Sequence, residues 1–299
     1  MAATPDAPFS AHRCASVSAS GSSTGRIVTG FAALRSAELA AYIAQSVAFP
    51  STMVDRIVPA TTEADLAALE HELGLRDHGA VFTERFSQWA IEDRFAGPRP
   101  GWDKHGAQLV SDVAPYETAK LRMLNGAHSA LAYCGLEREH TFVHEAIADS
   151  TLRSLVERLM GEGATSFTPA PGQDLSAYAD ALLARFADPA LNHRLMQIAM
   201  DGSQKIPQRW LETLAAQHGR KGGECPAILE ALAAWMRHVR GDARPVDDPL
   251  ADTLARLWAE NGAPGIAAAL FGERGLFAHH WRADPRILDK LTELLGERP

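Results

Sequence analysis

Cysteine is scarce in this chain, which contains only Cys14, Cys134 and Cys225. Their odd number and wide spacing exclude a disulfide framework, and no Cys-x-x-Cys pair indicates a zinc site. Long apolar runs are also absent, because no stretch of about 18 apolar residues occurs that could span a membrane. These absences favour a cytoplasmic protein in a reducing compartment, without a membrane partner.

Excess positive charge is lacking as well. The formal net charge is −8, with 29 Lys and Arg against 37 Asp and Glu, which argues against a nucleic-acid partner held by phosphate contacts. With 46% hydrophobic and 22% charged residues, the chain has the composition of a globular protein with ample material for a core. No internal repeat predicts a solenoid or a propeller.

The N-terminal residues 1–25 are rich in Ala, Ser and Gly. They lack a basic region followed by an apolar core, so we do not expect a secretory signal. Their composition leaves a transit peptide open as an alternative. We predict instead an atypical, poorly ordered N-terminus.

In the rest of the chain, the pattern of apolar and turn-forming residues changes near residue 110. Residues 26–110 mix short apolar runs with turns: a helix is predicted over 35–45, extended chain over 47–59, a helix between Thr62 and Gly74, and a strand over 81–91. From residue 111 onward the pattern is helical almost throughout. The predicted fold is mainly α, with a large helical domain over 111–299 behind a partial α/β segment over 26–110. Its helices are expected at 116–136, 151–160, 175–186, 192–200, 207–217, 226–239, 250–260 and 287–295.

The clearest chemical pattern is Lys120, Asn125 and His128 in one predicted helix. At about 100° per residue, Asn125 lies roughly 140° and His128 roughly 80° around the helix from Lys120, so all three can face one cleft. A desolvated Lys can act as a base, Asn can donate to a developing oxyanion, and His can orient a hydroxyl. The alternative is an ordinary half-buried helix with a solvated Lys.

Two weaker patterns leave alternatives open. His140 and His144 are four residues apart and could face one metal ion, but surface histidines explain them as well, and we predict no metal site. Glu117 lies one turn before Lys120, where it could tune the pKa of that lysine or relay protons, or be a plain surface residue.

The stretch from Ala119 to Cys134, AKLRMLNGAHSALAYC, resembles the polyol-specific long-chain dehydrogenases, the family of mannitol 2-dehydrogenase and fructuronate reductase. Residues 47–63, 86–101 and 197–210 carry the resemblance further, in the order that the family has them. In that family the K-x4-N-x2-H helix is catalytic and no metal takes part. The resemblance therefore implies that Lys120 is the general base, Asn125 the oxyanion partner and His128 the residue that orients the substrate.

The same resemblance implies substrate contacts. Asp55 falls where the family places an acid near the substrate, and Lys205 falls where a Lys reaches the far end of the substrate. Gln197 stands where mannitol-specific members can carry Arg, which tilts the prediction towards a hexuronate or aldonate. For Asp55, the alternative is an ion pair with Arg56 or a loop cap. For Lys205, the alternative is a solvated lysine at the start of a helix.

Two departures from the family pattern stand near the N-terminus. No Gly-x-Gly-x-x-Gly loop is present, and Gly21–Gly25 follows no predicted strand, so we expect most of the cofactor-binding Rossmann domain to be missing and NADH to bind weakly or not at all. Ser16 takes the place of an Asn that holds the substrate oxygen in the family. A truncated gene, a start-site error or a degenerate paralogue would each explain residues 1–25 as unrelated sequence.

The resemblance implies an oxidoreductase that interconverts a secondary alcohol and a ketone on a linear polyol or sugar acid. The implied reactions are D-mannonate to D-fructuronate and D-mannitol to D-fructose, with NAD or NADP as cofactor, in a monomer or weak oligomer. The alternative is an inactive remnant that binds a sugar or a protein. The choice between NAD and NADP stays open because the deciding acid or Arg after a second strand is not identifiable.

Overall fold

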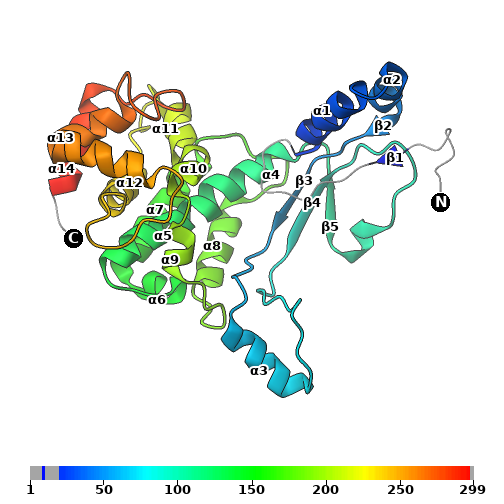
Figure 1. Ribbon diagram of the computed structural model, residues 1–299, viewed down its shortest axis with the longest axis horizontal. Helices are drawn as coiled ribbons and strands as arrows, with labels where there is room; N and C mark the ends of the chain where they lie inside the picture. The colour runs from blue at the N-terminus through cyan, green and yellow to red at the C-terminus, as the bar shows by residue number, and fades with distance from the viewer. Residues whose placement is uncertain (1–8, 11–19, 297–299) are drawn as a thin grey trace. The chain divides into compact units, whose positions relative to one another are not determined.

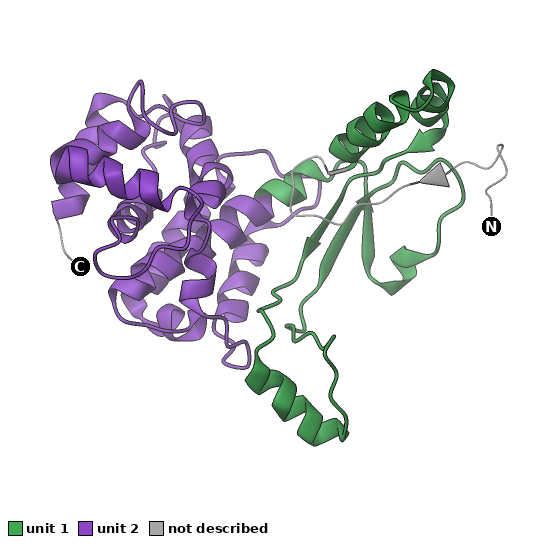
Figure 2. Ribbon diagram, viewed as in Figure 1, with its two compact units in different colours: residues 1–118 green, residues 119–299 purple. Residues whose placement is uncertain are grey.

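The computed structural model describes residues 9–10 and 20–296, which fall into two compact units, residues 1–118 and residues 119–299 (Figure 2). The prediction placed the boundary between residues 110 and 111. The first unit extends beyond residue 110 because Val113 is buried with Met53 and Ala90, and Tyr116 packs against the same cluster. Among the described residues, no helix is long and apolar enough to cross a membrane.

The first unit is built on a small mixed sheet. Strand β3 (Thr52–Asp55) pairs antiparallel with β4 (Gln88–Glu92), which pairs in parallel with β5 (Ala107–Val110). Met53, Ala90 and Val113 form a small buried cluster on it. The other elements are β1 (Phe9–Ser10), α1 (Ser20–Ala33), α2 (Ala37–Ser46), β2 (Val47–Ala48, parallel to β1), α3 (Glu63–Leu73), the 3₁₀ turn η1 (Trp102–His105) and α4 (Ala114–Ala119).

Helix α3 shows how local sequence sets its own bounds. The Thr62 hydroxyl accepts from the Asp65 N–H at 3.2 Å, and the Asp65 carboxylate accepts from the Thr62 N–H at 2.8 Å, which forms a capping box. At the other end Gly74 takes φ 72°, the left-handed conformation that glycine adopts without steric cost. Both predicted ends of this helix are therefore confirmed.

The second unit is a helical domain in which α5 (Gly126–Glu137) is central. Every residue of α5 from Gly126 to Leu136 is buried, and the helix contacts α6, α7, α9 and α12 (Figure 1). A helix that is apolar all round must be covered on all sides. The unit comprises η2 (Lys120–Asn125), α5, α6 (Val143–Ala148), α7 (Ser150–Ala164), α8 (Leu175–Phe186), α9 (Leu195–Ala199), α10 (Gly202–Ile206), η3 (Pro207–Leu211), α11 (Glu212–Gln217), α12 (Pro226–His238), α13 (Ala251–Phe271) and α14 (Pro285–Gly296).

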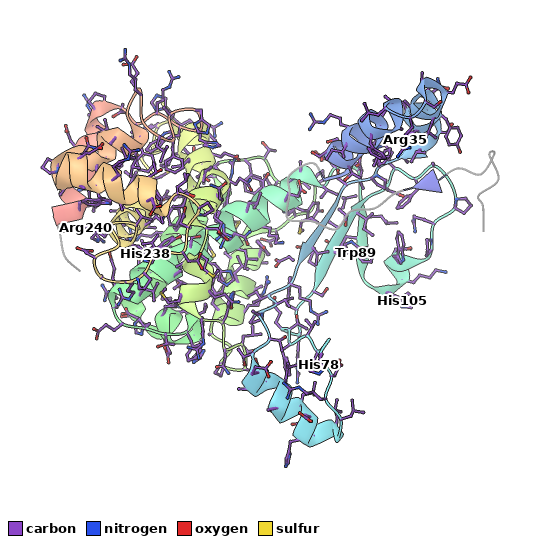
Figure 3. All side chains as sticks on the ribbon, in the orientation of Figure 1. Arg35, His78, Trp89, His105, His238 and Arg240 are labelled. Atoms are coloured by element: carbon purple, nitrogen blue, oxygen red, sulfur yellow. The ribbon has the colours of Figure 1, made fainter. Side chains whose placement is uncertain are left out.

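Aromatic rings fill the core of the second unit. Trp210, Trp235 and Tyr133 are each almost completely buried. The Tyr133 ring lies 6.2 Å from the ring of Trp210 and 5.2 Å from that of His238, which Figure 3 labels on α12. The Tyr133 hydroxyl donates to the Ala199 carbonyl at 3.1 Å, so α5 is tied to the end of α9 by a polar contact as well as by packing.

Several predicted bounds are corrected by the structure. The predicted strand over 81–91 forms only at 88–92, because Thr83 and Glu84 instead bond to the chain at Arg56 and Ile57. The predicted helix over 192–200 forms only at 195–199, because Arg194 is extended and the Leu195 N–H bonds to the Thr141 carbonyl, while Met200 leaves the helical conformation at the other end. Residues 20–25, assigned to the atypical N-terminus, form the first turns of α1, whereas residues 1–8 and 11–19 lie outside the described residues.

Candidate functional site

A π-helical turn lies at the centre of the candidate site. Helix α4, η2 and α5 follow one another without a break, which confirms the helix predicted over 116–136. Within it, η2 is a π segment, and the Gly126 N–H bonds to the carbonyl of Leu121, five positions earlier. A π turn holds more residues than an α turn, so Lys120 and Asn125 lie nearer to one face than the roughly 140° of a regular α-helix.

His128 is a buried and neutral imidazole. It is 7% exposed, and its ring lies 4.7 Å from the ring of Phe186 and 5.3 Å from that of His193. Burial, helped by the neighbouring His193 and by the positive charges of Arg209 and Arg185, holds the pKa of His128 well below its ordinary value. Its Nε2 is buried without a hydrogen-bond partner in the described part of the chain, so the ring keeps an unused donor or acceptor.

Lys120 and Asn125 are half-buried, and Glu117, which precedes them on the same helical stretch, is buried. Glu117, on α4, is only 7% exposed, so the interpretation of it as a plain surface carboxylate is wrong. Burial keeps open its predicted influence on Lys120.

A second π segment, η3, packs against the first. From it, Arg209 Nη1 donates to the Asn125 carbonyl at 3.3 Å and to Ser129 Oγ at 2.7 Å, and Trp210 Nε1 donates to the Gly126 carbonyl at 3.2 Å. Sequence reasoning missed Arg209. The available signal was Pro207, because a proline inside a helical pattern predicts a local distortion of the backbone.

The DGSQK sequence forms a turn that fixes the position of Lys205. Asp201 takes the left-handed conformation, and Ser203 bonds to the Asp248 carboxylate through its N–H at 2.7 Å and its Oγ at 2.6 Å. Gly202 is required because a Cβ there would lie 2.5 Å from Tyr133 Oη and 2.7 Å from Trp235 Nε1. This turn leads the chain directly into α10, which carries Lys205.

Lys205 is half-buried, and its ammonium donates to the Met200 carbonyl and, at 3.4 Å, to the Ile198 carbonyl. Burial, together with the charge of Arg209, lowers the pKa of Lys205. Lys205 is therefore partly shielded from solvent and held by backbone acceptors, which does not favour the alternative of a freely solvated lysine. The contacts tie Lys205 to the end of α9, the helix that also carries the half-buried Gln197.

Asp55 belongs to the first unit and lies on β3, opposite Gln88. It is completely buried. Arg56 does not form the ion pair considered for it, because its guanidinium donates to Thr83 Oγ1 at 2.9 Å and to the Glu84 carbonyl at 2.9 Å. Ser16, the predicted replacement for the family's Asn, lies outside the described residues.

The histidines considered for a metal face different partners. His140 Nε2 lies 3.7 Å from Asp149 Oδ2, and the His144 ring stacks on Phe142 with centroids 5.5 Å apart. Within residues 9–10 and 20–296, no three His, Cys, Asp or Glu side chains gather as a metal site would require.

The glycines at the start of α1 serve packing. A Cβ at Gly21 would meet the Phe49 carbonyl and lie 2.7 Å from the Ser51 nitrogen, so this glycine lets α1 approach the chain before β3. The Gly21 N–H donates to Ser51 Oγ at 3.2 Å. We therefore assign no phosphate contacts to these glycines. Among the described residues, none forms a glycine-rich strand–turn–helix that would hold a dinucleotide.

Comparison with known proteins places the chain in a family. The model of the mannitol dehydrogenase C-terminal domain matches residues 112–295, and that of the mannitol dehydrogenase Rossmann domain matches residues 2–104. The chain is 41% identical over 276 residues to D-mannonate oxidoreductase of Escherichia coli, covering 90% of this chain and 57% of that protein. It is 36% identical over 297 residues to mannitol 2-dehydrogenase of Phaeosphaeria nodorum, covering 96% and 51%.

A solved structure of a mannitol 2-dehydrogenase is also similar to this chain. Mannitol 2-dehydrogenase of Pseudomonas fluorescens, in a ternary complex with NAD and D-mannitol, superposes with a TM-score of 0.82 at 32% identity, covering 96% of this chain and 59% of that one. The chain thus spans between about half and three fifths of the length of these relatives.

The match to the Rossmann domain corrects two predictions. Because it begins at residue 2, residues 1–25 are not unrelated sequence, and the prediction that most of the cofactor-binding domain is missing is not supported. The prediction relied on one glycine-rich loop, which marks a single turn of such a domain, whereas the rest has no comparable local signature. With both domain models matched along its length, the chain belongs to the mannitol dehydrogenase family.

Proposed function

We propose that this chain oxidises a secondary alcohol on a linear polyol or sugar acid, and reduces the corresponding ketone, with Lys120 as general base. The observation that carries the proposal is the π turn of η2, which brings Lys120 and Asn125 towards one face of a helix that continues to the buried His128. π turns occur frequently at functional sites. The matches to both domain models support the same activity.

The three side chains have complementary roles. In its amine form, Lys120 accepts the proton of the alcohol hydroxyl. The Asn125 side-chain amide donates a hydrogen bond to the same oxygen as negative charge develops on it. His128 is neutral, because burial depresses its pKa, and its Nε2, which has no hydrogen-bond partner among the described residues, is suited to bind a substrate hydroxyl.

The remaining proposed contacts concern the chain of hydroxyls and its far end. We assign Lys205 and Gln197 to the far end of the substrate, Asp55 to a substrate hydroxyl, and Ser16 to the position of the family's Asn. Lys205 is tied to the end of the helix that carries Gln197, which supports a shared role for the pair. A hexuronate or aldonate is the favoured substrate, and the 41% identity to a D-mannonate oxidoreductase supports this choice over D-mannitol.

The proposed hydride partner is NAD(H) or NADP(H). The Rossmann-domain match and the NAD complex of the P. fluorescens relative support it. Because no described residue forms a phosphate loop, the steps above are confined to the alcohol side. The alternative of an inactive binding remnant is not favoured, since the family match extends over both domains.

The test is an assay of the purified chain with NADH or NADPH and each candidate ketone. Oxidation of the reduced cofactor should be fastest with D-fructuronate and slower with D-fructose. Lys221→Ala alters an exposed lysine of the unit that contains Lys120. It is the matched control for substitution of Lys120 and should keep full activity. Absence of turnover with every pair, in a folded protein that does bind NADH, would contradict the proposal.

A further inference from the structure

Arg209 is a cation that has no anionic partner in the part of the chain that the structure describes. Its guanidinium is half-buried, and its hydrogen bonds go to two neutral acceptors, the Asn125 carbonyl and Ser129 Oγ. Among the described residues, no carboxylate forms an ion pair with it. Burial lowers the pKa of Arg209 to about 10, which still leaves the side chain charged at neutral pH. A charge enclosed at this cost calls for a structural or functional reason.

The acceptors of Arg209 lie where the π turn ends. Asn125 is the last residue of η2, and Gly126 is the first residue of α5. The carbonyls of both residues receive side-chain donors from η3, at 3.3 Å from Arg209 and 3.2 Å from Trp210. A π turn is a disfavoured conformation that persists only when its surroundings hold it. These two donors are such surroundings.

We propose that Arg209 is a positioning residue that holds the π turn of η2, so that the Asn125 side chain and Lys120 share one face. The inference rests on the proposed function. Arg209 acts through the backbone of Asn125, not by touching the reacting atoms. Ser129, one turn further along α5, serves as its second anchor, because its Oγ accepts the shorter of the two bonds at 2.7 Å.

Lysine cannot replace this arginine fully. One guanidinium nitrogen, Nη1, bonds to both the carbonyl and the hydroxyl, and the planar group keeps its direction when two acceptors lie side by side. An ammonium would keep the charge but lose that fixed geometry. Charge and positioning can therefore be separated experimentally.

The test combines kinetics with a double-mutant cycle. Arg209→Met should lower kcat by about 10- to 100-fold, the scale expected when a catalytic group is displaced by about 1 Å, and Arg209→Lys should recover only part of this. In an Asn125→Ala background, Arg209→Met should lower kcat by less than about 3-fold, because Arg209 acts through Asn125, whose side chain is already gone and no longer needs to be aligned with Lys120. Additive losses in the cycle would overturn the proposal.

Two further measurements keep the inference testable if the assay detects no activity or if Arg209→Met fails to fold. Ser129→Ala removes one anchor with a small change in volume, and it should speed amide hydrogen exchange within residues 120–129. Arg220→Met, an exposed control, should leave that exchange unchanged. Unchanged amide exchange in both Ser129→Ala and Arg209→Lys would overturn the proposal that Arg209 holds the π turn. An inactive wild type, combined with faster exchange in these variants, would overturn only the proposed function.

Discussion

At the scale of single residues, the chemistry of this chain depends on burial. His128 is buried and Lys205 is half-buried. For both side chains the pKa falls mainly because burial disfavours the charged form. A neutral imidazole can donate or accept a hydrogen bond, and a lysine with a lowered pKa gives up its proton more readily than a solvated one. Arg209 experiences the same burial, but its ordinary pKa is high enough for its charge to persist.

Lys120→Ala tests the proposed base. The substitution should lower kcat/KM for alcohol oxidation by at least about 100-fold, the lower end of general-base contributions, and leave the Kd of the cofactor nearly unchanged. In the wild type, the oxidation rate should rise with pH through one ionisation, because an ammonium group cannot accept the alcohol proton. Steady-state kinetics across pH with a fixed cofactor concentration measures both effects. Near-normal kcat with an unchanged pH profile would remove Lys120 from the mechanism.

At the scale of elements, the site depends on how helices distort. Both η2 and η3 are π segments within longer helical stretches, and side chains from η3 bond to the end of η2. The Asp201 turn between α9 and α10 is a third departure from regular helix. Regular helices provide the frame, and these three irregular turns orient the polar groups of the candidate site.

Gly202→Ala tests the close packing behind the Asp201 turn. The added Cβ would lie 2.5 Å from Tyr133 Oη and 2.7 Å from Trp235 Nε1, so the free energy of unfolding should fall by about 1–3 kcal/mol. The matched control is Gly161→Ala in α7, where nothing lies within 4 Å of the new Cβ, and it should be neutral or stabilise by up to about 1 kcal/mol. Urea denaturation of both variants gives the comparison. Equal stabilities would show that the turn relaxes without cost.

At the scale of the whole molecule, buried neutral histidines couple stability to pH. Burial lowers the pKa of His193 to about 4, and it also lowers the pKa values of His128 and His238. Above about pH 6.5, the ordinary histidine value, folded and unfolded chains bind equal numbers of protons at these sites. Below it the unfolded chain takes up protons first, so stability is lost as the pH falls towards the folded pKa values.

His193→Gln should therefore reduce the acid sensitivity of the fold. Between pH 7.5 and pH 5.0 the wild type should lose about 1–2 kcal/mol more of its free energy of unfolding than this variant loses. His218→Gln, at an exposed position after α11, should behave as the wild type does. Denaturant titrations at the two pH values measure the difference. Identical losses in wild type and His193→Gln would show that His193 titrates alike in both states.

Much of the fold followed from local sequence. The capping box at Thr62 and the stop at Gly74 fixed α3, and the bounds of α8 were predicted to the residue, because caps and helical periodicity act between neighbours in the chain. The helical run through Lys120, Asn125 and His128 was predicted for the same reason. Their proposed roles came from family resemblance and stay predictions.

What local sequence could not decide was the shape of that helix and its partners. The π turn of η2 coincides with packing against η3, which lies more than 80 residues later in the chain, where Arg209 and Trp210 reach the carbonyls of Asn125 and Gly126. The burial of His128 likewise depends on residues far along the chain, since Phe186 and His193 lie against its ring. Sequence determined which residues form helices and carry reactive groups, because hydrogen bonding along a helix is local. Tertiary structure alone decided how those groups face and titrate, because helix distortion and desolvation depend on what packs against them.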